Sequence, residues 1–211
     1  MNSVEKEISY QSTNSYSTLN TLTSQTKNIW IVCHGMGYLS RYFLKYFKAL
    51  NADENYIIAP QAQSKYYLKD QFTHVGASWL TRENTIAETV NILNYIDAVI
   101  ENEQLPLHSN IIMLGYSQGV SIVMRYVASR KLQCNQLVLM SGGIPKELTQ
   151  DDLNFYNGAV KMIYGDKDEY LNNERLVYEQ QRIKELFKEN VEIIPFDGNH
   201  MVNVELINSL V

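Results

Sequence analysis

Short runs of apolar residues recur along the chain, and most are followed by segments in which apolar residues repeat at helical spacing. The runs cover residues 28–33, 56–59, 111–114, 136–140, 160–164 and 191–196. Continuous apolar runs of this length are typical of strands buried on both faces of a parallel sheet. Strands that alternate with helices indicate a mostly parallel central sheet with helices on both faces. The pattern, which no repeat or linker interrupts, predicts a single α/β domain over residues 1–211.

Two of the predicted helices have a polar start signal. Ser40 is placed to cap one helix, and Thr85 with Glu88 has the spacing of a capping box for another. The inner faces predicted for these helices are Phe43, Phe47 and Leu50 in the first, and Ile86, Val90, Leu93 and either Val99 or Ile100 in the second. Further helices are predicted after residue 117, from about residue 172 to about residue 190, and near the C-terminus.

The first 27 residues are rich in Ser, Thr, Asn and Tyr and alternate only weakly. Residues 8–10 and 16–19 predict N-terminal strands, paired antiparallel at the edge of the sheet. A disordered tail is the alternative for the first few residues. The N-terminus has no apolar segment of the kind found in secretory signals, so no such signal is expected. No run of 18 apolar residues occurs, so no membrane span is expected.

Composition narrows the classes of function. The net charge of −5 provides no basic surface for nucleic acid. Cys33 and Cys134 are the two cysteines, and their spacing fits neither a metal site nor a disulfide framework. We therefore expect two reduced thiols in a cytoplasmic protein, with no metal ion or other cofactor. Nothing in the sequence indicates an oligomeric state.

Gly115-Tyr116-Ser117-Gln118-Gly119 lies between an apolar strand and a predicted helix. G-x-S-x-G in this position is typical of a nucleophile elbow, a tight turn that holds a serine hydroxyl clear of the strand end. Glycines are needed because side chains on either side of the serine would collide across the turn. The backbone N–H of Gln118 would point to the space where an oxyanion forms. Ser117 is therefore the candidate nucleophile, and a plain turn with a surface serine is the alternative.

An acid and a histidine follow the serine in the chain, each just after a predicted strand. His200 is the candidate base that would take the proton of Ser117 as it attacks. Asp168 is the preferred acid to orient the imidazole, and Asp166 is the alternative, in which case the other aspartate is a turn residue. Asp197 is too close to His200 in the chain to be the usual partner.

The loop after the first central strand, His-Gly-Met-Gly, is expected to supply a second oxyanion donor as a backbone N–H. Met36 is the preferred donor and Gly37 the alternative. His34 begins the same loop and could face the site. The alternative is a structural role, in which a hydrogen bond from His34 holds the loop. His74 and His108 lie in polar connections, where we expect them to be solvated.

Four motifs together resemble the phospholipase/carboxylesterase family of α/β-hydrolases, small serine esterases that include the acyl-protein thioesterases. They are H-G-M-G after the first central strand, G-Y-S-Q-G at the elbow, G-D-K-D before a helix and G-N-H near the C-terminus. The resemblance covers about residues 28–205 and implies the α/β-hydrolase fold; residues 141–159 are too few for a large lid domain. The family's catalytic serine, acid and histidine fall on Ser117, Asp168 and His200, and its oxyanion donors on Met36 and Gln118.

The chain departs from the family near the substrate end of the site. Tyr38 stands where many members have Asp, and Tyr170-Leu171 stands where they often have V-P. Trp79 resembles a family tryptophan near the acyl pocket, and packing of its loop onto the sheet is the alternative. These four residues and Gly37 are the candidates for substrate binding.

The sequence therefore predicts a serine hydrolase that cleaves small carboxylic esters through an acyl-enzyme intermediate. An acyl thioesterase or a lysophospholipase is the alternative within the same chemistry. A non-catalytic member of the fold that binds a ligand is the alternative from another class. The expected partner is a small-molecule ester, and a site without a cap domain predicts a preference for short acyl chains.

Overall fold

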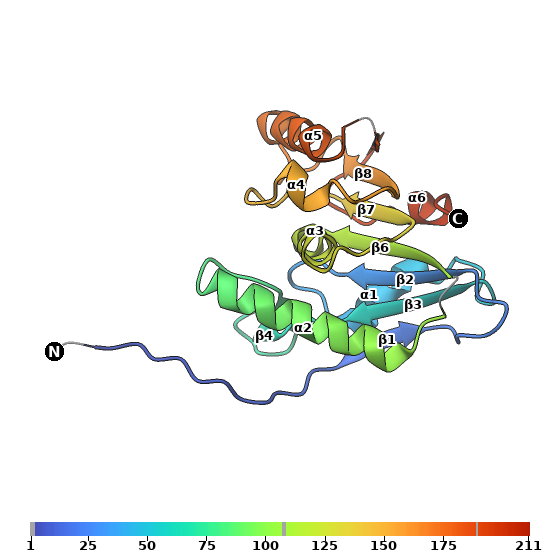
Figure 1. Ribbon diagram of the computed structural model, residues 1–211. Coiled ribbons are helices and arrows are strands. Elements are labelled where there is room, and N and C mark those ends of the chain that lie inside the picture. The colour runs from blue at the N-terminus through green and yellow to red at the C-terminus, as the bar shows by residue number, and fades with distance from the viewer. Residues whose placement is uncertain (1–2, 107–108, 189) are drawn as a thin grey trace.

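The computed structural model describes residues 3–106, 109–188 and 190–211 and is built on a seven-stranded sheet (Figure 1). The strands lie in the order β1-β3-β2-β6-β7-β8-β9. All neighbours pair in parallel except β1, which runs antiparallel to β3. The strands are β1 (Tyr16–Leu19), β2 (Asn28–Cys33), β3 (Asn55–Pro60), β6 (Asn110–Tyr116), β7 (Gln136–Met140), β8 (Ala159–Gly165) and β9 (Val191–Phe196).

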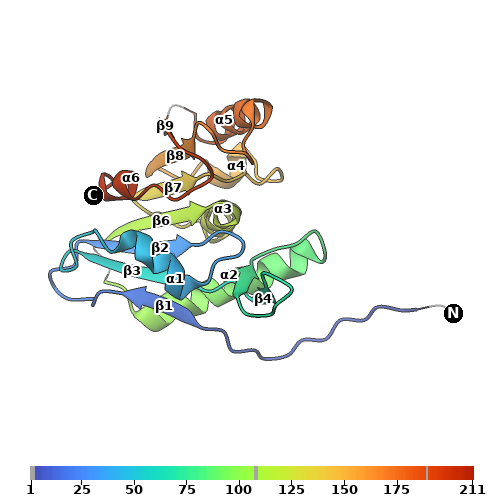
Figure 2. The ribbon, with the colours of Figure 1, turned by 180° about the vertical axis from the view of Figure 1, so that it is seen from behind.

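Helices cover both faces of the sheet (Figures 1 and 2). They are α1 (Ser40–Phe43) with its 3-10 continuation η1 (Leu44–Phe47), α2 (Thr85–Glu103), α3 (Gln118–Arg130), α4 (Gln150–Leu153), α5 (Asn173–Phe187) and α6 (Val204–Asn208). Within β2, Ile29 and Ile31 pack in the core under α2, α3 and α5, whereas Trp30 and Val32 pack under α1, η1 and α6. The mostly parallel sheet with helices on both faces is confirmed.

The N-terminal segment forms one edge strand, whereas the sequence predicts two. β1 pairs with β3 at the edge of the sheet, as expected for residues 16–19. Residues 8–10 form no strand, and the side chains of Ile8 and Tyr10 are exposed in a tail that extends away from the sheet (Figure 1). Two apolar side chains bury too little surface to offset the entropy of ordering the chain.

Helix α2 buries only the second half of the predicted inner face, which is Leu93 and Val99, together with Ile92 and Ile96. Ile86 and Val90, which the pattern assigns to the inner face, are 86% and 52% exposed. They line a groove of about 620 Å³ that α2 forms with α3 and residues 147–152. Burial in α2 begins at residue 92, so the first turns of the helix do not contribute to the core.

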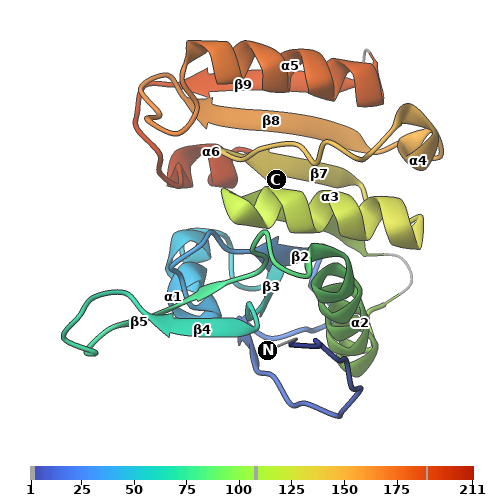
Figure 3. The same ribbon diagram turned by 90° about the vertical axis from the view of Figure 1, so that its left-hand side faces the viewer.

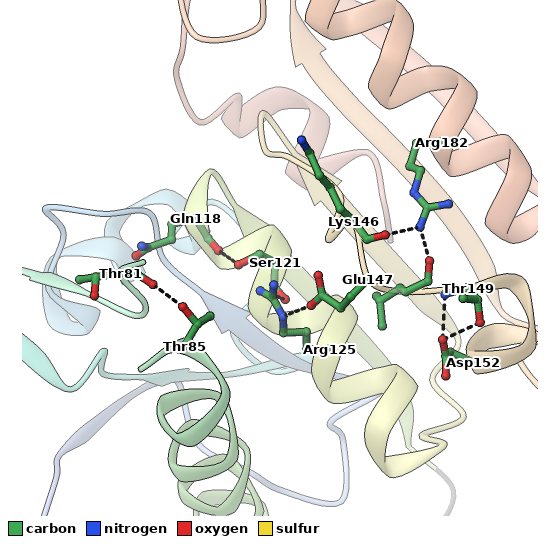
Figure 4. A network of polar contacts seen from close by, with 11 residues as sticks. Thr81, Thr85, Gln118, Ser121, Arg125, Lys146, Glu147, Thr149, Asp152 and Arg182 are labelled. Atoms are coloured by element: carbon green, nitrogen blue, oxygen red, sulfur yellow. Dashed lines mark hydrogen bonds and ion pairs between the residues drawn. The ribbon is translucent and has the colours of Figure 1, made fainter. Parts of the chain in front are cut away.

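The predicted helix caps are also wrong. Leu39 is the N-cap of α1, and Ser40 is the first helical residue, with its hydroxyl 2.9 Å from that of Ser17. No side chain caps α2; the Thr85 hydroxyl donates instead to the carbonyl of Thr81 (Figure 4). Short hydroxyl side chains readily bond to nearby groups outside the helix, which removes them as caps.

A hairpin that the sequence pattern does not predict projects from the sheet (Figure 3). It consists of β4 (Ser64–Tyr67) and β5 (Val75–Ser78), paired antiparallel. All four residues of β4 are exposed, whereas three of the four residues of β5 are buried. β5 therefore contributes to the body of the protein, and β4 lies on its outside.

The connection between β7 and β8 contains only the short helix α4 and is attached to its neighbours at several points (Figure 4). Glu147 accepts a hydrogen bond from Arg125 of α3 at 2.6 Å. Arg182 of α5 donates to the carbonyl of Lys146 at 3.1 Å and to that of Leu148. As predicted, this segment forms no large lid domain.

Three further features bear on whether the protein spans a membrane, contains a disulfide or binds a metal ion. Within the described ranges, no helix combines the length and apolar character needed to cross a bilayer. Cys33 and Cys134 are buried and do not form a disulfide. Among the same residues, no group of three or more His, Cys, Asp or Glu side chains is arranged to hold a metal ion.

Candidate active site

Ser117 occupies the sharp turn between β6 and α3, where its backbone is strained. Its φ and ψ are 53° and −118°, a combination that a residue with a Cβ adopts only when its surroundings impose it. A side chain on Gly119 would begin 2.0 Å from the carbonyl oxygen of Cys33, and one on Gly115 would begin 2.5 Å from that of Gly119. The turn therefore depends on both glycines of the motif, and it leaves Ser117 partly exposed at the strand end.

Three side chains from three different loops form a continuous chain of hydrogen bonds. The Oγ of Ser117 lies 2.9 Å from Nε2 of His200, and Nδ1 of His200 lies 2.7 Å from Oδ2 of Asp168. Oδ1 of Asp168 accepts hydrogen bonds from the backbone N–H groups of Tyr170 at 2.9 Å and Leu171 at 3.2 Å. The buried carboxylate accepts a hydrogen bond from the N–H at Nδ1, so the ring proton stays on Nδ1 and Nε2 is free to accept a hydrogen bond from the serine hydroxyl.

The other two candidate acids have different partners. Asp166 is exposed, and its Oδ1 accepts the backbone N–H of Gly198 at 3.2 Å. This is the turn role expected for the aspartate that does not orient the imidazole. Asp197 is exposed and pairs with Lys167. Asp168 is thus the aspartate that contacts His200.

His200 is held by contacts that the sequence pattern does not reveal. The hydroxyl of Tyr116, the residue before the serine, donates to the carbonyl of His200 at 3.1 Å. The centroid of the Tyr116 ring lies 5.3 Å from that of the imidazole, and the centroid of the exposed Tyr170 ring lies 4.7 Å from it in an edge-to-face arrangement. Glu169 accepts the backbone N–H of His200 at 3.4 Å. In the sequence, the only indication of this role for Tyr116 is that it places a hydroxyl group at the end of an otherwise apolar strand.

The loop of residues 34–37, hereafter the 34–37 loop, faces the elbow. A Cβ on Gly35 would lie 3.0 Å from Cβ of Ser117. The backbone N–H of Gly37 donates to the carbonyl of Ala77 at 2.8 Å, so it is already engaged. The N–H groups of Met36 and Gln118 have no hydrogen-bond partner among the described residues. Both groups are therefore available to donate to an added oxygen.

His34 is buried beneath this loop. Its Nδ1 donates to the carbonyl of Gly35 at 2.8 Å, and its Nε2 accepts the backbone N–H of Ala62 at 3.2 Å. Burial lowers the pKa of His34 to about 4, so the ring is neutral at neutral pH. These contacts agree with the structural role considered for His34, in which it holds the loop by hydrogen bonds. His74 is exposed beside Thr73, and His108 lies outside the described residues.

The candidates for substrate binding divide into two groups. Tyr170 is exposed, and Gly37 and Tyr38 are half-buried; burial raises the pKa of the Tyr38 hydroxyl to about 12. Trp79 is only 1% exposed, and Leu171 is buried as well. Both side chains lie below the surface that a substrate would touch. The indole N–H of Trp79 donates to the carbonyl of His34, which is the packing alternative for this residue.

Comparison with known proteins extends these observations. A model of the phospholipase/carboxylesterase family matches residues 16–210. Similar solved structures include an acyl-protein thioesterase 2 from Zea mays (13% identity, TM-score 0.68, 94% of this chain and 96% of that one). Esterase PE8 is another, with 16% identity, a TM-score of 0.66 and coverage of 93% of this chain and 97% of that one. A phospholipase/carboxylesterase from Dyadobacter fermentans is a third, with 20% identity, a TM-score of 0.64 and coverage of 95% of this chain and 97% of that one. No curated protein sequence matches the chain.

Proposed function

This chain belongs to the phospholipase/carboxylesterase family of α/β-hydrolases, and from that premise we propose that it is a serine hydrolase that cleaves small carboxylic esters. The observation that carries the proposal is the unbroken hydrogen-bond chain from Ser117 through His200 to Asp168. Serine alone is a weak nucleophile at neutral pH, because its proton must leave as the oxygen attacks. The histidine is placed to take that proton, and the carboxylate is placed to stabilise the resulting imidazolium.

In the first half-reaction, Nε2 of His200 takes the hydroxyl proton while Oγ of Ser117 bonds to the ester carbonyl carbon. The electron pair of the carbonyl moves to its oxygen and gives a tetrahedral oxyanion. The free N–H groups of Met36 and Gln118 are the donors proposed for this oxygen. Collapse reforms the carbonyl and breaks the bond to the alcohol oxygen, which leaves with the proton from His200.

Water then repeats the sequence on the acyl-enzyme. His200 takes a proton from water as the hydroxide oxygen bonds to the acyl carbon, and the same N–H groups stabilise the second oxyanion. Collapse breaks the bond to Ser117, whose oxygen takes the proton back from His200. The carboxylic acid leaves and the resting enzyme is restored.

The surroundings of the serine favour small substrates. Exposed Met36 and Tyr170 border the site, and the short 141–159 connection cannot close over it. Such an open site leaves most of a long acyl chain in water. A thioesterase is the second candidate, because the same oxyanion chemistry cleaves thioesters and one structural neighbour is an acyl-protein thioesterase.

Hydrolysis of p-nitrophenyl esters by the wild type and by Ser117→Ala tests the proposal. The wild type should be active, and the variant should keep its fold with a kcat lower by roughly 10⁴- to 10⁶-fold. Ser121→Ala, which changes a serine one turn along α3, is the matched control and should stay within about twofold of wild type. Residual activity of pure Ser117→Ala within tenfold of wild type would refute the assignment, and an inactive wild type would favour a ligand-binding protein.

A further inference from the structure

The side chain of Gln118 connects the elbow to the segment that follows β5. Its Oε1 accepts the backbone N–H of Trp79 at 2.8 Å, and its Nε2 donates to the carbonyl of Leu80 at 2.7 Å. Nε2 also lies 3.1 Å from the hydroxyl oxygen of Ser78. The amide of Gln118 is therefore bonded at both ends to three consecutive residues of one segment.

The same segment supports the 34–37 loop at two points. The carbonyl of Ala77 accepts the N–H of Gly37 at 2.8 Å, and the indole of Trp79 donates to the carbonyl of His34 at 2.8 Å. The two backbones are in direct contact, since a Cβ on Gly76 would begin 2.7 Å from Cα of Gly37. One end of the loop is thus fixed by Trp79, which the Gln118 amide holds directly, and the other end by Ala77, which precedes Ser78 in the same segment.

We propose that the side chain of Gln118 is a positioning residue for the oxyanion hole. The backbone N–H of Gln118 is one donor of the hole, and its amide fixes the segment that holds the loop carrying the second donor, Met36. One residue thereby sets the separation of two donors from distant parts of the sequence. The inference rests on the proposed function, because the separation matters only when an oxyanion forms on the acyl carbon attacked by Ser117.

The effect follows from the narrow range over which an oxyanion hole works. Both donors must lie within about 2.7–3.1 Å of one oxygen, and losing one of them costs about 10²- to 10³-fold in kcat. Gln118→Met keeps the length of the side chain and the backbone N–H but removes the amide's hydrogen bonds to Ser78, Trp79 and Leu80. A displaced donor retains part of its effect, so we expect kcat to fall about 10- to 100-fold with KM within about twofold of wild type.

Two readouts separate positioning from general stability. A trifluoromethyl ketone forms a tetrahedral adduct with an active-site serine, so its inhibition constant should rise by the factor by which kcat/KM falls. The pH profile of kcat/KM should keep its midpoints, because the contacts of His200 and Asp168 are untouched. The control is Ser121→Ala, which removes only the hydroxyl bond to the backbone carbonyl of Gln118 (Figure 4) and should match wild type.

A second variant covers a failure of Gln118→Met to fold. Trp79→Phe keeps an aromatic ring but deletes the indole N–H that donates to the carbonyl of His34. It should lower kcat about 3- to 10-fold and, like Gln118→Met, leave KM within about twofold of wild type. Folded Gln118→Met with kcat within threefold of wild type, or with an unchanged inhibition constant, would overturn the proposal. Wild-type protein without Ser117-dependent hydrolysis would instead overturn the proposed function, so the two failures are distinguishable.

Discussion

Replacing Asp168 by Asn separates the geometry of the acid from its charge. The Asp168 side chain is buried, with one oxygen on the backbone N–H groups of Tyr170 and Leu171 and the other on Nδ1 of His200. In the variant, the amide oxygen takes the position of Oδ1 and accepts the same two backbone hydrogen bonds, because an NH₂ group in that position would face two N–H donors. The NH₂ group then donates to Nδ1, and the ring proton moves to Nε2, where it faces Ser117.

A histidine in this tautomer cannot take the serine proton. We expect Asp168→Asn to lower kcat by about 10⁴-fold, which is about 5 kcal/mol of transition-state stabilisation. The variant should fold normally, since it keeps the shape of the side chain and its two backbone hydrogen bonds. Asp166→Asn is the matched control: it retains an acceptor for the N–H of Gly198 and should stay within about threefold of wild type.

The assay is steady-state hydrolysis of p-nitrophenyl butyrate by the wild type and both variants, with active-site concentration taken from the burst of p-nitrophenol. Circular dichroism melting of each protein confirms that the variants are folded. A large loss in Asp166→Asn with a small loss in Asp168→Asn would refute the reasoning and move the acid by two residues.

Two further predictions follow from the open site and from the buried histidine. On p-nitrophenyl esters, kcat/KM should peak at about C2 to C6 without activation above the micelle concentration, because each further CH₂ gains little of the roughly 0.8 kcal/mol that full burial provides; a steady rise through longer chains would contradict this. The folded-state pKa of His34 lies near 4, below the ordinary value of about 6.5, so the unfolded chain binds this proton first as the pH falls. The contribution of His34 to the free energy of unfolding is therefore fully present above about pH 6.5 and should fall by up to about 3 kcal/mol towards pH 4. Urea unfolding of His34→Gln should lack this part of the slope, and an unchanged slope would contradict the assignment.

The central strands could be predicted from the sequence because burial on both faces leaves a continuous apolar run, as in β2 and β3. The hairpin could not be predicted, since all four residues of β4 are exposed and show no alternation between buried and exposed positions. In α2 the sequence offers two apolar stripes at helical spacing, one through Ile86 and Val90 and one through Ile92 and Ile96. Only the placement of the helix on the sheet decides between them.

The hydrogen-bonded residues of the site were predictable because the hydrolase pattern fixes both their order and their position after a strand. Asp168 and Asp166 are two residues apart in one loop, so the residues alone do not separate them. The amide contacts of Gln118 leave no signal, because they reach backbone groups of Trp79 and Leu80 that any residue type would supply. The burial of Trp79 likewise depends on how its loop folds back onto the sheet.

Covalent labelling with a fluorophosphonate tests the central claim, that Ser117 is a nucleophile activated by His200, most directly. The phosphorus is attacked by the serine oxygen, fluoride leaves, and the adduct is identified by mass spectrometry of the digested protein. We predict one adduct, on the peptide that contains Ser117, with no adduct in Ser117→Ala and much slower labelling in His200→Ala. An unlabelled, folded wild-type protein, or an adduct on a different serine, would contradict the account.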